Sequence, residues 1–158
     1  MADETYRVER STTIAAPPAR VYEQIADFHN WTKWSPWEGI DPQLQRTYSG
    51  PESGPGAAYS WSGNRKAGTG RMQITDATEP TKVQIDLVFE KPWKARNDTV
   101  FTIEPDAGGS RVTWSMTGQK TFMTKMMGIF KSMDQMIGPD FEKGLAQLKA
   151  TAETPATN

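Results

Sequence analysis

The 158-residue chain contains no cysteine and a single histidine, His29. Without cysteine it has no disulfide framework, no thiolate nucleophile and no zinc site of the cysteine type. One histidine cannot complete a zinc site unless carboxylates supply the other three ligands, and no acidic cluster has the spacing of a calcium-binding loop. We therefore expect no bound metal and no cofactor.

An excess of one charge and a long apolar run are also missing. The 18 basic and 19 acidic side chains leave a net charge of -1, which gives no general attraction for nucleic acid or for an anionic membrane. No apolar stretch approaches the ~20 residues that span a bilayer, and the acidic first residues do not resemble a secretion signal. We expect a cytoplasmic protein that binds no nucleic acid and does not insert stably into a membrane. The sequence leaves the oligomeric state open.

Recognisable catalytic motifs are absent too. A serine–histidine–acid triad would have to use His29, and the pattern Gly-X-Ser-X-Gly does not occur. His29 follows a predicted helix, in a tryptophan-containing segment that we interpret as surface. We therefore assign no catalytic residue.

The chain does have a long series of alternating segments. Apolar and polar residues alternate from Tyr6 to Ile14, which predicts a half-buried strand. A helix is predicted from Pro18 to about Ala26, because proline is tolerated in a first helical turn. Further strands, separated by turn residues, are predicted at 45–49, 57–62, 68–77, 82–90, 95–104 and 111–118. With no helix between them, they predict successive hairpins in one antiparallel sheet, most simply a meander.

After Gly118 the apolar residues recur every three or four positions, to about Ala152. This spacing predicts a long amphipathic helix, and its first half is rich in methionine, which adapts to irregular surfaces. Gly138-Pro139 predicts a kink or a break, so a short helix followed by a long one is equally possible. The apolar face consists of Met123, Met126, Met127, Phe130, Met133, Ile137, Phe141, Leu145 and Leu148.

Six or seven strands and one long helix predict an α+β domain whose sheet curves around the helix. Space left between them would form a small-molecule pocket with apolar walls and few polar groups. The same side chains could instead interlock as a dry core. The polar inward-facing residues are mainly Tyr59, Asn97 and Thr99, and the apolar ones on the strands are Trp61, Met72, Phe89, Phe101, Trp114 and Met116.

Arg10 and a group of tryptophans each have two interpretations. Arg10 lies on the apolar side of the first strand, so its charge must be paired or must reach a polar group of a ligand. Trp31, Trp34 and Trp37 repeat every three residues, which places their rings on nearly one side of a tight turn. They would either cap the open end of the sheet or line the mouth of a cavity.

Several segments, in order, resemble the START-related superfamily, in particular its polyketide cyclase/dehydrase and lipid-transport branch. They are Ile14–Tyr22 with Asp27, Phe28 and Trp31, then 59–64, 68–72, 112–116 and 141–149. The similarity covers about residues 5–152. It implies a helix-grip fold, in which a curved antiparallel sheet is wrapped on a long C-terminal helix around an apolar cavity. We expect a single START-like domain over 1–158, frayed at 1–5 and 153–158.

The functions that the resemblance implies are broad. Members of this superfamily carry lipids, sterols or hormones, cyclise aromatic polyketides, or assist chaperones as binding modules, and no shared catalytic motif comes with them. The resemblance implies that the cavity is lined by Trp61, Met72, Phe89, Phe101, Trp114 and Met116 on strands and by Met126, Phe130, Met133, Ile137 and Phe141 on the helix.

Three functions follow as alternatives. The first is binding of a small, mostly apolar molecule, lipid-like or aromatic, in that cavity, with Arg10, Trp34, Tyr59 and Thr99 as further contacts. The second is a cyclase or dehydratase in the same cavity, where Arg10 or Tyr59 polarises a carbonyl and positioning supplies most of the rate. The third is a protein-interaction module without a cavity, which predicts an exposed apolar patch.

Overall fold

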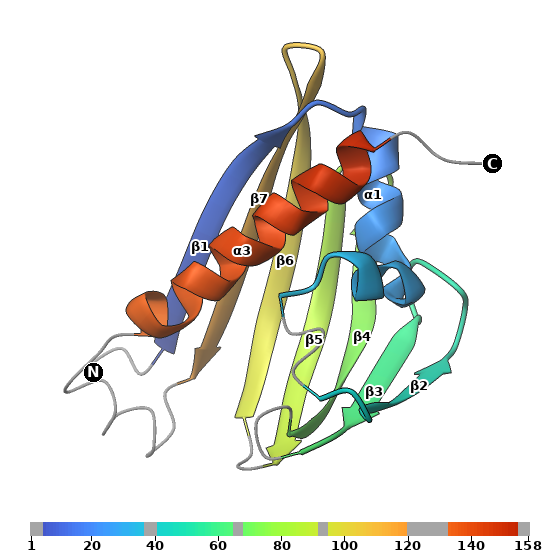
Figure 1. Cartoon of the computed structure of the whole chain (residues 1–158), viewed down its shortest axis with the longest axis vertical. Coiled ribbons are helices and arrows are strands. Elements are labelled where there is room, and N and C mark those ends of the chain that lie inside the picture. The colour runs from blue at the N-terminus through green and yellow to red at the C-terminus, as the bar shows by residue number, and fades with distance from the viewer. Residues whose placement is uncertain (1–4, 37–40, 65–67, 92–94, 120–132, 155–158) are drawn as a thin grey trace.

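The computed structural model describes residues 5–36, 41–64, 68–91, 95–119 and 133–154. Within these ranges, seven strands form one curved antiparallel sheet, with helices on its concave face (Figure 1). The strands are β1 (Thr5–Ile14), β2 (Gln45–Ser49), β3 (Ala58–Ser62), β4 (Thr69–Thr78), β5 (Lys82–Lys91), β6 (Ala95–Asp106) and β7 (Gly109–Gln119). The helical elements are α1 (Pro18–Ala26), the 3-10 helix η1 (Phe28–Lys33) and α3 (Met133–Glu153).

The sheet confirms the predicted helix-grip α+β fold. Its strand order is β1-β7-β6-β5-β4-β3-β2, and every neighbouring pair is antiparallel. β2 to β7 therefore form the predicted meander. β1 lies beside β7 at the far edge, because α1 and η1 carry the chain across the concave face before β2 begins (Figure 1).

The register determines which side chains meet on the concave face. Arg10, Trp114 and Phe101 are partners in one row across β1, β7 and β6. In the next row, Thr99 lies between Met116 on β7 and Ile85 on β5. These rows face the helices, which is why their side chains, other than that of Arg10, are buried.

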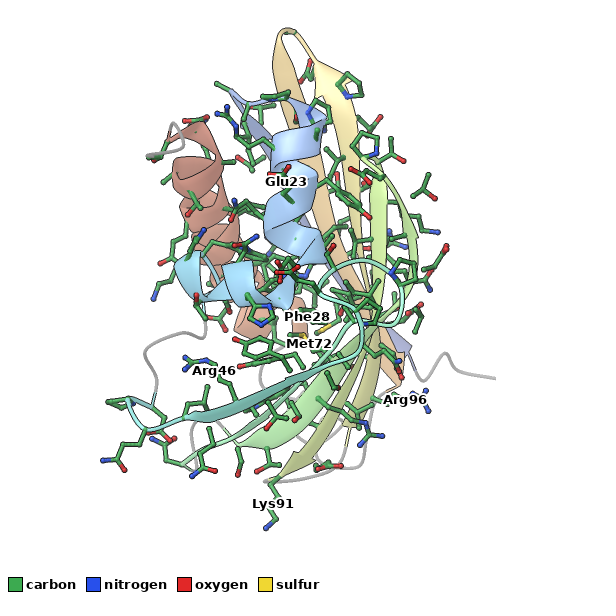
Figure 2. All side chains as sticks on the ribbon, turned by 90° about the vertical axis from the view of Figure 1, so that its right-hand side faces the viewer. Glu23, Phe28, Arg46, Met72, Lys91 and Arg96 are labelled. Atoms are coloured by element: carbon green, nitrogen blue, oxygen red, sulfur yellow. The ribbon has the colours of Figure 1, made fainter. Side chains whose placement is uncertain are left out.

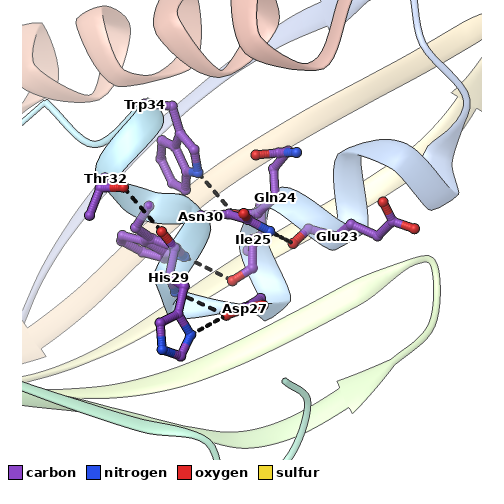
Figure 3. Close-up of polar contacts among 9 residues, drawn as sticks. Glu23, Gln24, Ile25, Asp27, His29, Asn30, Thr32 and Trp34 are labelled. Carbon is purple, nitrogen blue, oxygen red and sulfur yellow. Dashed lines mark hydrogen bonds and ion pairs between the residues drawn. The ribbon is translucent and has the colours of Figure 1, made fainter. Parts of the chain in front are cut away.

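Groups that follow α1 in the chain hold its C-terminal end (Figure 3). The last four carbonyls of a helix have no partner within the helix. In α1 each of them accepts a hydrogen bond from outside: Glu23 O from Asn30 Nδ2 at 3.0 Å, Gln24 O from Trp34 Nε1 at 2.9 Å, Ile25 O from Trp31 Nε1 at 2.8 Å and Ala26 O from the Gly54 amide at 3.1 Å. Both indoles are therefore fixed in orientation by the helix that precedes them.

α3 crosses in front of β1, β7 and β6 and closes the core there (Figure 1). Phe141 stacks on Trp114 with ring centroids 4.0 Å apart. Gly144 permits this approach, because a Cβ at that position would lie 2.8 Å from both Trp114 and Pro36. The helix continues through Pro139, so the predicted break does not occur there. Packing of this kind outweighs the roughly 3 kcal/mol that an interior proline costs a helix.

Candidate ligand-binding site

One part of the concave face is closely packed. Five aromatic side chains from η1 and its C-cap, β6, β7 and α3 form a cluster that we call the aromatic core: Trp31, Trp34, Phe101, Trp114 and Phe141. Each is at most 5% exposed, and the ring contacts have centroid distances of 4.0–6.4 Å. This part of the face has the dry, interlocked arrangement that the sequence left as an alternative.

The β2 side of the face is different. Four partly exposed aromatic residues from β2, β3 and β5 form what we call the aromatic strip: Tyr48, Tyr59, Trp61 and Phe89. Tyr48 and Tyr59 are cross-strand partners with centroids 5.2 Å apart, and Trp61 follows at 6.0 Å from Tyr59. Trp61 meets Phe89 edge to face at 5.7 Å. The strip therefore runs without interruption from the β2 edge to β5.

Gly70 makes the strip continuous. It lies on β4 between Trp61 of β3 and Phe89 of β5, and it is the register partner of both. A Cβ at this position would lie 2.6 Å from the Trp61 ring and 2.6 Å from the Val88 carbonyl oxygen. Because glycine has no side chain, the Trp61 indole can reach across β4 to Phe89.

A pocket of about 300 Å³ opens at the β2 end of the strip. It is lined by Phe28, His29, Tyr48, Ser49, Gly50, Pro51, Glu52, Ala57 and Ala58. Phe28 joins this pocket to the other two aromatic groups, because its ring lies 6.0 Å from Tyr59 and 5.6 Å from Trp31. Figure 2 shows the side chain of Phe28, the first residue of η1, on the lower side of that element, with Met72 of the sheet below it.

His29 lies at this pocket and is held in place. Asp27 Oδ1 accepts a hydrogen bond from the His29 amide at 2.9 Å and lies 2.8 Å from Nδ1 (Figure 3). The imidazole also stacks on Tyr48 at 3.9 Å, while 52% of the side chain stays exposed. The sequence interpretation did not place Phe28, His29 or Tyr48 at a pocket. The available signal was Asp27 two residues before His29, a spacing typical of an Asx turn.

Arg10 lies on the concave face, as the alternation predicted, and it is paired. Its Nε donates a hydrogen bond to Glu142 Oε2 of α3 at 2.8 Å, and its Nη1 donates to the Glu9 carbonyl at 2.8 Å. The guanidinium occupies the space that a side chain at position 138 would need, which glycine leaves open. The sequence left open whether the charge of Arg10 is paired within the protein or reaches a polar group of a ligand. In the structure it is paired.

Two polar residues of β6 are buried on this face. Asn97 and Thr99 are each 4% exposed. The Oγ1 of Thr99 has no hydrogen-bond partner within the described ranges. Met116, the register partner of Thr99, is 5% exposed, and Met72 on β4 is 8% exposed.

Some predicted residues lie outside the described part of the chain. These are Trp37, Met123, Met126, Met127, Phe130 and the side chain of Met133. Ile137 is partly buried against the core. Among the described residues, no three histidine or acidic side chains gather to hold a metal ion, and no helix is long and apolar enough to cross a membrane.

A curved sheet that grips a C-terminal helix, with an aromatic strip on its concave face, defines a helix-grip protein. The chain belongs to the polyketide cyclase/dehydrase and lipid transport family, whose model matches residues 5–153. A search of the curated proteins finds no match.

Solved structures share the fold at low sequence identity. A protein of Rhizobium leguminosarum superposes with a TM-score of 0.69 at 13% identity, covering 95% of each chain. Protein CV1439 of Chromobacterium violaceum gives 0.66 at 16% identity, over 96% of this chain and 99% of its own. The Aha1 dimer of Colwellia psychrerythraea gives 0.63 at 16% identity, over 94% and 96%. At these identities the likeness concerns the fold alone.

Proposed function

We propose that this protein binds a small, mostly apolar molecule on the concave face of its sheet, at the aromatic strip. The observation that carries the proposal is the aromatic strip, whose rings stay partly exposed beside a closely packed aromatic core. Contiguous exposed apolar surface is typical of binding sites, because a protein gains stability by burying such groups elsewhere.

The shape of the strip supports a ligand with a flat or extended apolar body. The rings of Tyr59 and Trp61 stack with an interplanar angle of 22° and centroids 6.0 Å apart, so one apolar molecule can contact both. Burial of apolar area contributes about 25 cal/mol per Å². The adjoining pocket of about 300 Å³ is at the lower end of small-molecule sites, which suits a small ligand or one end of a longer one. Membership in a family described by lipid transport and polyketide chemistry supports a ligand of this kind.

Binding is better supported than catalysis. Arg10 is one of the two residues that could polarise a carbonyl. Its guanidinium donates a hydrogen bond to Glu142 at the interface with α3, away from the aromatic strip. Tyr59 remains as a hydroxyl-bearing member of the strip. We therefore propose a binding protein as the primary function, with the strip supplying most of the contact area.

The test uses N-phenyl-1-naphthylamine, a neutral dye whose fluorescence rises in apolar surroundings. Phe89→Asp places a charge on the strip, and we expect it to weaken dye binding at least about tenfold, since an unpaired charge in an apolar site is costly. The matched control is Val88→Asp. Val88 is the preceding residue on the opposite face of β5, and its register partners are Arg71 and Arg96, which accommodate an added carboxylate.

Circular dichroism of both variants verifies that they are folded. If Phe89→Asp unfolds, Trp61→Ala replaces it, because Trp61 is partly exposed and lies in the same strip. Equal dye affinity in the strip variant and in Val88→Asp would contradict the proposal. A wild-type protein that does not bind the dye at all would contradict it as well.

A further inference from the structure

We infer that the bound molecule carries a neutral hydrogen-bonding group, a carbonyl or a hydroxyl, that pairs with the hydroxyl of Thr99. The inference rests on the proposed function and specifies the ligand of that site. It starts from a buried polar group on the concave face whose partner is not supplied by the described part of the chain. Thr99 Oγ1 is fully covered and makes no hydrogen bond there.

A threonine at position 99 lowers the stability of the folded protein if the surrounding core is dry. Its register partners are Met116 and Ile85, both apolar, and the side chain is 4% exposed. A buried hydroxyl without a partner destabilises a protein, whereas valine has nearly the same shape and an equal preference for strands. Neighbouring core positions do use valine, as at Val83 and Val112. Packing therefore does not explain the hydroxyl, but a ligand that hydrogen-bonds to it would.

Thr99 lies within reach of a molecule held on the aromatic strip. Tyr59 is three strand spacings and one row away, about 16 Å. Its row continues the apolar surface through Met72 and Leu87 to Asn97, two residues before Thr99 on β6. Met116 is the cross-strand neighbour of Thr99. The unbranched methionine side chain rearranges at low cost, so a ligand can displace it and uncover the hydroxyl.

The charges on this face indicate a neutral group. Among the described residues of the concave sheet face, the cations are Arg10 and Arg46. Arg10 donates to Glu142. Arg46 is exposed on the edge strand β2 (Figure 2), four strand spacings or about 19 Å from β6. A carboxylate beside Thr99 would be buried without a cation, which is costly, whereas a carbonyl or hydroxyl is satisfied by one hydrogen bond.

The test compares two probes that differ only in this group, 2-acetylnaphthalene and 2-ethylnaphthalene, by displacement of N-phenyl-1-naphthylamine. We expect Thr99→Val to lower the ratio of ketone to hydrocarbon affinity by about 3–10-fold, the effect of one hydrogen bond. Thr99→Ser keeps the hydroxyl and should preserve the ratio. Without ligand, Thr99→Val should melt about 2–4 °C higher than the wild type, because it removes an unsatisfied buried group.

Each remaining outcome overturns the inference in a distinguishable way. An unchanged affinity ratio in Thr99→Val, or binding of the dye but of neither naphthalene, overturns it while the proposed function stands. Tighter binding of 2-naphthoate than of the ketone overturns the assignment of a neutral group. A lower melting temperature of unliganded Thr99→Val shows that the hydroxyl already has a structural partner, and also overturns it. If the dye itself does not bind, the proposed function fails and the inference fails with it.

Discussion

Trp61 and Gly70 illustrate how a single residue shapes the candidate site. The indole of Trp61 spans β4 only because position 70 has no side chain. The alternation in the sequence predicted that Trp61, Tyr59 and Phe89 face inward, and the structure places them together in the aromatic strip. The sequence could not predict that two of these rings touch across an intervening strand, because that contact depends on the register between β3, β4 and β5.

Gly70→Ala is expected to destabilise the protein by about 1–3 kcal/mol, a typical cost of overpacking, and to weaken dye binding because Trp61 must tilt. One of the atoms in the way is the Val88 carbonyl oxygen, which cannot move independently of its strand. Urea unfolding and dye titration measure the two effects. Gly108→Ala is the control. Its added Cβ has open space but its φ of +86° is strained, so it should lose stability and keep the dye affinity. A Gly70→Ala variant as stable as the wild type would contradict this account.

At the scale of elements, the strands were predicted more fully than their arrangement. Alternation and turn residues are local signals, so the predicted strand and α1 bounds agree with the structure to within about two residues. The position of β1 beside β7 and the Arg10–Glu142 pair depend on contacts between distant parts of the chain, which periodicity does not reveal. Of the kink or break predicted at Gly138-Pro139, the break does not occur, because α3 continues through Pro139 and packs against Trp114 and Pro36.

The C-terminal end of α3 is joined to the end of β1 by Glu153. Its carboxylate accepts hydrogen bonds from the Ala15 amide at 2.7 Å and from Lys149 Nζ at 2.6 Å. The backbone hydrogen bond from Ala15, followed by the hydrogen bond from Lys149, holds the pKa of Glu153 below its ordinary value. A carboxyl with a lower pKa in the folded than in the unfolded state adds stability above its unfolded pKa. It loses that contribution as the pH falls through its folded pKa.

We therefore expect Glu153→Gln to be less stable than the wild type at pH 7. The difference should shrink as the pH falls below about 4.3, the ordinary pKa of a glutamate, and through the lower pKa of Glu153 in the folded protein. Urea unfolding at a series of pH values between neutrality and pH 3 measures it. A difference in unfolding free energy that stays constant over this range would show that the ionised carboxylate is not what joins the two elements.

At the scale of the whole molecule, the concave face combines the two alternatives that the sequence left open. The aromatic core is closely packed, while the aromatic strip stays partly exposed beside a pocket. Inward-facing residues can be identified from alternation, but the space left between them depends on sheet curvature and helix position in three dimensions. The pocket was missed for the same reason, since its wall combines η1 with the β2–β3 connection.

The contrast between the closely packed aromatic core and the partly exposed aromatic strip predicts that backbone amides are protected unevenly from hydrogen exchange. Hydrogen exchange should be slowest in the centre of β6 and β7, around Phe101 and Trp114, where the side chains are buried and each strand has two neighbours. It should be fastest in β2, the edge strand, whose side chains are mostly exposed, because such segments open without global unfolding. Exchange followed by nuclear magnetic resonance measures both. Equal protection of β2 and β6 would mean that the sheet opens only as a unit.

The tryptophans of the aromatic core give the protein an optical signature of its own. Trp31, Trp34 and Trp114 have mutual centroid distances of 4.5, 5.7 and 6.4 Å, close enough for their electronic transitions to couple. The near-ultraviolet circular dichroism of the folded chain should therefore contain a tryptophan signal that disappears when fixed side-chain packing is lost. That signal follows the integrity of the core, whereas dye fluorescence follows the strip, so damage to the scaffold and damage to the site can be read separately in one sample.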